Sequence, residues 1–270
     1  MYYSQQYINY FANCNHHQTQ ILKACQAHGA RIILSTWPKR HAARLNDYPF
    51  IYAIRARLGM GLEEFLKLST HDPPACAACT SGPNRRAVPE HFTSCPTTHQ
   101  QTHQAVITEI YSCLKAAGIS QVEIERNVGD NLRVDIMIRD PAPANPQQPY
   151  YMIDPTIIQS YNANDPTDIP DTNRKLKQAN TKKKTTYAHA ALAHSATVVP
   201  LAFSSLGAYH YEFTSFLQRT ARTASATGNY FPSTDGSFTN FWKTNILFTL
   251  ARATAKSASE AAWRHRLAMV

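Results

Sequence analysis

The feature that most constrains this chain is two close pairs of metal-ligating residues separated by a short spacer. Cys76 and Cys79 form the first pair, and His91 and Cys95 form the second. Thiolate and imidazole groups at this spacing are typical of a tetrahedral zinc site. Because four protein ligands leave no open position for substrate, we expect a structural Zn²⁺ ion. His99 continues the four-residue step from His91 and Cys95, so it is the alternative to His91 as a ligand.

Two aspartates interrupt apolar, strand-like segments downstream of these pairs. They are Asp135 and Asp154. A buried carboxylate is costly unless a cation or a set of hydrogen bonds compensates it. If the two strands form a hairpin, both side chains can meet at one end of a sheet and bind Mg²⁺ or Mn²⁺, which would activate a water molecule. Glu125, at the end of the preceding strand, is either a third acidic ligand or a partner of Arg133.

A cluster of three lysines at 182–184 follows the acids. An amine that reaches the attacking water or the leaving oxygen would complete a nuclease site, and Lys183 and Lys184 are the candidates. The alternative is that the cluster is the solvated face of a helix. Basic residues near the acids and the lysine cluster are also candidate nucleic-acid contacts: Arg133, Arg174, Lys175, Lys177 and Lys182.

The net charge of the chain favours a polyanionic partner. Lysine and arginine exceed aspartate and glutamate, which gives a formal net charge of +9. Each phosphate that such a protein neutralises releases condensed counterions, so we expect DNA, or RNA, as the partner. No apolar run approaches the roughly 18 residues of a membrane helix, so no membrane association is predicted. The first residues lack the basic flank and apolar core of a secretory signal, which predicts an intracellular protein.

The periodicity of the apolar residues predicts an α/β fold. The expected elements are a helix at 103–117, strands at 121–126, 132–139 and 150–158, a lysine-rich helix at 172–193 and a strand at 197–204. The second and third strands are expected to form an antiparallel hairpin. This order matches the common core of restriction-endonuclease-like folds, which is a mixed sheet flanked by helices.

Four regions follow from this pattern. A helical N-terminal region at 1–70 precedes a zinc knuckle at 71–102, a nuclease core at 103–225 comes next, and a helical tail at 226–270 ends the chain.

In the order of its motifs, the chain resembles the C-terminal region of non-LTR retrotransposon polyproteins that carry a restriction-enzyme-like endonuclease. Residues 53–59 resemble the short helix before the knuckle of such elements, and residues 133–135 stand where the family usually has Arg/Lys-Pro-Asp. Residues 154–156 stand where Asp-Val-Thr is common, residues 183–187 resemble the lysine-tyrosine helix, and residues 199–207 resemble the strand and turn that follow it.

The resemblance implies a metal-dependent DNA endonuclease of the PD-(D/E)XK type. In this family the enzyme nicks target DNA so that the exposed 3′ end primes reverse transcription, which implies element RNA as a further partner, an upstream reverse transcriptase domain and a nuclear location. Asp135 and Asp154 carry over as metal ligands and Lys183 as the catalytic lysine. The alternative is a catalytically inactive nucleic-acid-binding zinc module derived from such an element.

The chain departs from the family pattern at two positions. Val134 replaces the usual proline, and Pro155 directly follows the second acid. Proline lacks the N–H group that a central strand uses in its hydrogen-bond ladder. Pro155 therefore indicates an edge strand, a bulge or a site that is no longer active.

Overall fold

The computed structural model describes most of the chain, and the described parts carry both groups of candidate residues. These parts are residues 14–35, 45, 47–58, 60, 62–68, 75–77, 79, 87, 89–92, 95–129, 131–141, 143, 145–159, 171–229 and 237–268. Most of the spacer between Cys79 and His91 lies outside them.

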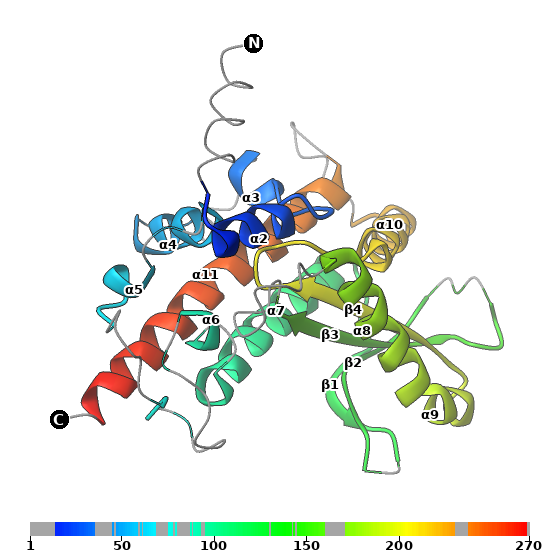
Figure 1. Ribbon diagram of the computed structural model, residues 1–270. Helices are drawn as coiled ribbons and strands as arrows, with labels where there is room; N and C mark the ends of the chain where they lie inside the picture. Colours follow the sequence, from blue (N-terminus) through cyan, green and yellow to red (C-terminus); the bar gives the residue numbers. More distant parts are fainter. Residues whose placement is uncertain are drawn as a thin grey trace.

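A mixed four-stranded sheet forms the centre of the fold (Figure 1). Its strands are β1 (Val122–Asn127), β2 (Arg133–Arg139), β3 (Tyr150–Ile158) and β4 (Ala196–Ser204), in the spatial order β1-β2-β3-β4. The β1–β2 and β2–β3 pairs are antiparallel, whereas β3 and β4 run parallel. The predicted α/β class and the predicted hairpin of the second and third strands are thereby confirmed.

Helices cover both faces of this sheet. Helix α7 (Pro96–Ala116) packs Val106, Ile107 and Ile110 into a core that includes alternate residues of β2 and β3. Helices α8 (Thr172–Thr186) and α9 (Ala188–Ala193) lie on the opposite face. There Tyr187 and Ala190 belong to a second buried cluster, which includes Met137 of β2 and Met152 of β3. Successive strand side chains point to opposite faces, so each strand contributes to both layers.

Helix α7 begins at Pro96 rather than near residue 103. Its first two turns are polar and carry no apolar period, which hid them from the sequence. Cys95 takes the N-cap position. Pro96 suits the first turn because an N–H group there would have no partner within the helix. The helix therefore runs through the expected boundary between knuckle and core, and it starts at a predicted zinc ligand.

Pro155 lies in a central strand, because β3 has β2 on one side and β4 on the other. The described β2–β3 pairing runs from Arg139 and Tyr150 to Ile136 and Ile153 and stops there. The Pro155 carbonyl lies 2.9 Å from His103 Nε2. The nitrogen and the carbonyl of one strand residue face the same side. The Pro155 nitrogen therefore faces the side of β3 on which pairing with β2 has ended. The missing N–H group of proline costs no β2–β3 hydrogen bond there.

The N-terminal region is helical in its described parts, as predicted. Its elements are α2 (His16–Ala24), α3 (Ile32–Ser35), α4 (Asp47–Leu58) and α5 (Leu62–Phe65), followed by the short helix α6 (Pro89–Phe92) in the knuckle. After the sheet come α10 (Tyr211–Ala226) and α11 (Phe238–Leu267).

The C-terminal segment is an integral wall of the fold rather than a tail. Helix α11 lies beside α7 and also contacts α3, α4, α6 and α10 (Figure 1). Its first half contributes Ile246 and Leu250 to the core that α7 shares with the sheet, and its second half contributes Ala258 and Ala262 to the core around the knuckle. The helices described in this structure include none with the length and apolarity that a membrane span requires.

Candidate functional site

Asp135 and Asp154 lie at the same end of the β2–β3 hairpin. The last described pair of this hairpin is Ile136 with Ile153, and Asp135 and Asp154 are the residues that adjoin this pair in the two strands. The charge of Asp135 contributes to the raised pKa of Asp154, and the charges of both acids contribute to the raised pKa of His103. The hairpin therefore places at one end of the sheet two carboxylates that are 19 positions apart in the chain.

Lys183 contacts the more deeply buried of these acids. Its Nζ lies 2.8 Å from Asp154 Oδ1, and Asp154 is 1% exposed. Burial raises the pKa of Asp154 above its ordinary value, although Lys183 and Tyr187 lower it in part; the Asp135 charge adds to the rise. The ion pair compensates the charge, but Oδ1 lacks a well-aligned hydrogen bond within the described residues. A carboxylate in this state is suited to a further cationic partner.

The position of Lys183 follows from how α8 packs on β4. One turn earlier, the buried Asn180 accepts a hydrogen bond from Ala202 N (3.1 Å) and donates one to His210 Nδ1 (2.6 Å). Leu176 is buried one turn before that. Residues at these spacings share one helix face, so the face that packs on the sheet also presents Lys183 to the acids.

Lys184 points elsewhere. Its Nζ forms an ion pair of 2.6 Å with Glu212 of α10. Of the two lysines that the sequence left as candidates, the structure brings Lys183 to Asp154 and directs Lys184 to a different element.

Tyr187 closes the α8 side of the site. Its hydroxyl donates a hydrogen bond of 2.7 Å to the Arg133 carbonyl. Burial raises the pKa of this phenol, and hydrogen bonding to Asp154 and the charges of both acids raise it further. Tyr187 therefore stays neutral and acts as a hydrogen-bond donor. Its ring centroid lies 5.8 Å from Lys183 Nζ, so the aromatic face also supports the lysine.

His103 is the site residue that sequence reasoning missed. It projects from α7, with Nε2 3.2 Å from Asp135 Oδ2 and 2.9 Å from the Pro155 carbonyl. A carbonyl only accepts hydrogen bonds, so Nε2 carries a proton. Burial alone would lower the pKa of His103, but the hydrogen bond and charge of Asp135, together with the Pro155 carbonyl and Asp154, raise it overall. The sequence offered only a histidine within a polar helical turn, which signals no contact with residues of the sheet.

Glu125 takes the second of its two expected roles. It lies on the edge strand β1, and its Oε2 is 3.3 Å from Arg133 Nη1. Both side chains of this pair are exposed, so the ion pair contributes little stability.

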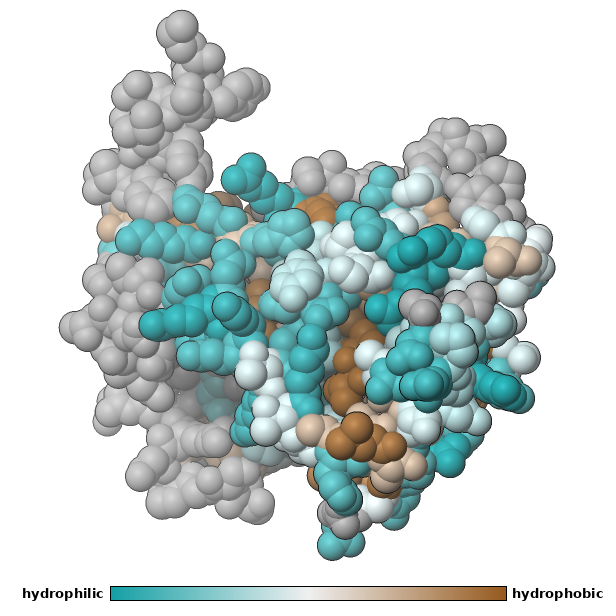
Figure 2. All heavy atoms as spheres, turned by 90° about the vertical axis from the view of Figure 1, so that its right-hand side faces the viewer, coloured by the Kyte–Doolittle hydropathy of each residue, from teal (hydrophilic) through white to brown (hydrophobic). Residues whose placement is uncertain are grey.

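The predicted nucleic-acid contacts on α8 lie on the helix that carries Lys183. Arg174, Lys177 and Lys182 are exposed, and Lys175 is partly exposed. Figure 2 shows that hydrophilic residues cover much of the side of the molecule that lies on the right in Figure 1, where α8, α9 and α10 are found, with a smaller hydrophobic patch among them. Contact of these residues with nucleic acid stays a prediction.

The second candidate site is the cluster of Cys76, Cys79, His91 and Cys95. One ligand atom from each residue lies within 4.8 Å of all the others, and Cys79 Sγ is 3.4 Å from His91 Nε2. Three thiols and one imidazole at such distances suit tetrahedral Zn²⁺, so the cluster could hold a structural zinc ion. His91 belongs to the cluster, and His99 does not.

The cluster is tied to both long helices. The Ala77 N–H, between the first two cysteines, donates a hydrogen bond of 3.1 Å to His265 Nδ1 of α11. Cys95 is the N-cap of α7, and burial raises the pKa of its thiol. The positive end of the α7 dipole favours a thiolate at this position. His103 follows two turns later, about 12 Å along the same helix.

The sequence matches no protein-family model and no curated protein sequence. The likeness to retrotransposon endonucleases therefore depends on the motifs themselves. Two of its features are present in the structure: a Cys3His group that could hold a metal ion, and a mixed four-stranded sheet with helices.

Proposed function

We propose that this protein is a DNA endonuclease that depends on Mg²⁺ or Mn²⁺. The observation that carries the proposal is the Lys183 ammonium 2.8 Å from the buried Asp154, at the sheet end where Asp135 also lies. The element order α7-β1-β2-β3-α8-α9-β4 supports it, because an α-β-β-β-α-β order is that of a restriction-endonuclease-like core. The four-ligand cluster is proposed to hold zinc in a structural role.

The proposed chemistry assigns a role to each side chain. Asp135 and Asp154 would hold the divalent cation, which when bound supplies an activated water and stabilises charge on the scissile phosphate. Lys183 would donate a hydrogen bond to the attacking water or to a phosphate oxygen. His103 holds Asp135 in place, and Tyr187 supports Lys183.

The test is nicking of supercoiled plasmid DNA with and without Mg²⁺. We expect metal-dependent conversion to the open circular form, with a loss of about 100-fold or more in Asp135→Ala, Asp154→Ala and Lys183→Ala. Lys184→Ala is the matched control, because Lys184 pairs with Glu212 instead. Nicking that survives both aspartate substitutions would show that the cleavage does not come from this site.

A role in retrotransposon integration would also determine the chemical end of the nicked strand. The nick should leave a free 3′-hydroxyl that can prime reverse transcription. Extension of the nicked strand by an added polymerase, without prior phosphatase treatment, checks this. Strands that extend only after phosphatase treatment would exclude the priming role while leaving endonuclease activity in place.

One observation favours a second candidate, a nucleic-acid-binding module without cleavage. Each acid already has a basic neighbour, since Lys183 pairs with Asp154 and His103 contacts Asp135. A site compensated in this way can persist in the fold without a divalent ion. This candidate predicts salt-sensitive DNA binding without nicking at any concentration of Mg²⁺ or Mn²⁺.

A further inference from the structure

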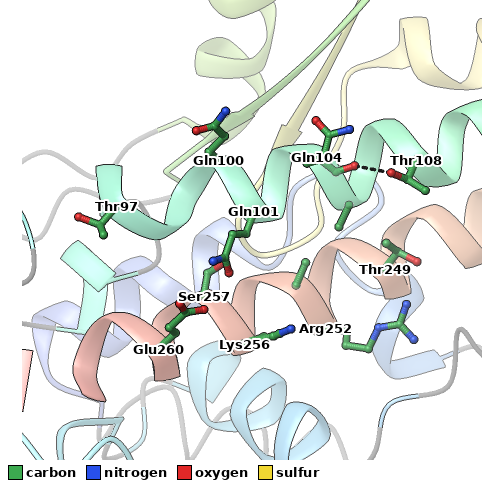
Figure 3. A pocket seen from close by; sticks show the side chains of 12 residues that line it. Thr97, Gln100, Gln101, Gln104, Thr108, Thr249, Arg252, Lys256, Ser257 and Glu260 are labelled. Atoms are coloured by element: carbon green, nitrogen blue, oxygen red, sulfur yellow. Dashed lines mark hydrogen bonds between the residues drawn. The ribbon is translucent and has the colours of Figure 1, made fainter. Parts of the chain in front are cut away.

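A groove runs between α7 and α11, formed by faces of these helices that do not carry the carboxylate site (Figure 3). It has a volume of about 880 Å³. A second hollow of about 570 Å³ adjoins it and shares Arg252, Lys256 and Glu260. The two hollows therefore share one stretch of α11, with α7 lining the first and α4 lining the second.

The walls of the groove combine amide and cationic side chains. Helix α7 contributes Gln100, Gln101 and Gln104, and Figure 3 shows Gln101 extending toward Ser257 of α11. Helix α11 contributes Arg252 and Lys256, which are four residues apart and therefore lie on one face of the helix.

The charge of the groove is positive. Glu260 also lines it, but this carboxylate is paired with Arg264 one turn later on the same helix. Arg252 and Lys256 are the described cationic residues that line both hollows, and Arg266 also lines the second.

The second hollow also has two aromatic rings in its lining. Tyr48 and Trp263 line the second hollow and are 38% and 53% exposed. Tyr48 stacks on Phe65 with a centroid distance of 4.8 Å, which holds its ring in place. Large exposed aromatic side chains beside a basic groove are the composition of sites that bind single-stranded nucleic acid, because bases stack on the rings while cations follow the backbone.

We propose that this groove binds single-stranded nucleic acid. Arg252 and Lys256 would contact phosphates, the glutamines would contact sugar and phosphate oxygens, and Trp263 and Tyr48 would stack against bases. The part of α11 from Thr249 to Arg266 is about 26 Å long, which suits a site of several nucleotides. The groove adjoins the helix turn that carries His103, yet its binding does not depend on cleavage at the carboxylates.

The test is fluorescence anisotropy of labelled oligonucleotides of about 20 nucleotides, with the zinc-loaded full chain and no Mg²⁺. One arm uses oligo(dT) and another uses oligo(U), so that DNA and RNA are distinguished. Arg252→Gln combined with Lys256→Gln should weaken binding roughly tenfold or more, and should reduce the slope of log affinity against log salt by about 1.4. Lys115→Gln combined with Arg139→Gln removes the same charge elsewhere and should change neither the affinity nor the slope by a comparable amount.

Trp263 gives an independent arm. Trp263→Leu should weaken binding about fivefold or more, and Trp263→Phe should retain most of it, because only the phenyl ring preserves stacking. Groove variants that bind as tightly as the wild type would overturn the proposal. An equal loss in the charge control, or competition by poly-glutamate as effective as that by the oligonucleotide, would overturn it as well, because either result identifies a general anion-binding surface.

Discussion

At the scale of single residues, Asp154 is a proposed metal ligand whose burial costs stability. It is almost completely buried, its pKa is raised mainly by burial, and Oδ1 has only the Lys183 ammonium as a close compensating partner among the described residues. A charge in such a position lowers the free energy of unfolding, and a bound cation would offset this loss. Functional sites commonly carry a cost of this kind. Asp135 avoids this cost through partial exposure and its contact with His103.

The pKa of Asp154 makes a prediction about pH and stability. A raised pKa in the folded state means that the folded chain binds more protons than the unfolded chain between the ordinary carboxyl pKa and the raised value. The contribution of this group to the free energy of unfolding is therefore present at low pH and is lost as the pH rises through the raised pKa. Asp154→Asn should remove this loss and stabilise the protein by about 1 kcal/mol at neutral pH in Mg²⁺-free buffer.

Thermal melting across the acidic to neutral range checks this. Asp171→Asn is the control, because Asp171 is an exposed N-cap of α8 and asparagine caps a helix equally well. A wild-type pH profile retained in Asp154→Asn would show that another group causes the dependence.

At the scale of elements, helix α7 joins the two candidate sites. Its N-cap is Cys95 of the Cys3His cluster, its third turn carries His103, and its apolar face packs on the sheet. The Thr102 and Ser257 hydroxyls form a hydrogen bond of 2.7 Å across to α11. A metal ion that orders the start of α7 therefore also fixes the position of His103 relative to Asp135.

Loss of zinc should accordingly destabilise the whole fold and not the knuckle alone. Cys79→Ser should abolish stoichiometric zinc binding and lower the melting temperature by about 5 °C or more, because metal binding contributes directly to folding. Zinc release, followed with a chromogenic chelator, and melting by circular dichroism measure the two effects. Cys25→Ser should keep its zinc, since Cys25 lies in α2's C-cap and outside the cluster. An unchanged melting temperature after complete chelation would contradict a structural role for the ion.

At the scale of the whole molecule, α11 makes the knuckle and the sheet one structural unit. Its successive turns enter first the core around the sheet and then the core around the cysteines. The small residues of its second half allow the knuckle to pack closely on the helix. His265 Nδ1 accepts a hydrogen bond from the Ala77 N–H. The regions predicted as knuckle, core and tail therefore share buried surface.

This continuity predicts a single cooperative unfolding transition. Leu250→Ala removes a fully buried side chain and should cost about 2–5 kcal/mol. The midpoint of zinc release should fall together with the midpoint of sheet unfolding, because the two cores share one helix. Leu192→Ala is the control, since Leu192 is 75% exposed and its loss should change neither midpoint. Zinc release that stays at the wild-type temperature in Leu250→Ala would mean that the knuckle unfolds independently.

The sequence by itself predicted most of the elements and the cluster of cysteine and histidine ligands. Spacing of cysteine and histidine pointed to the four-ligand cluster, and apolar alternation located the strands that hold Asp135 and Asp154. These signals are local, because ligand spacing and the periods of helix and strand are expressed within a few residues. The order of the strands along the chain followed for the same reason, and so did the lysine-rich helix, which the structure divides at Tyr187 into α8 and α9.

Only the tertiary structure decided which neighbours meet. Lys183 rather than Lys184 reaches Asp154, because packing of α8 on β4 sets the rotation of the helix. His103 joins the acids and accommodates Pro155, because α7 passes the sheet end at which β2–β3 pairing stops. These contacts join residues that are dozens of positions apart in the chain. Their geometry depends on how the elements pack against one another, and the sequence pattern of a single element does not specify that packing.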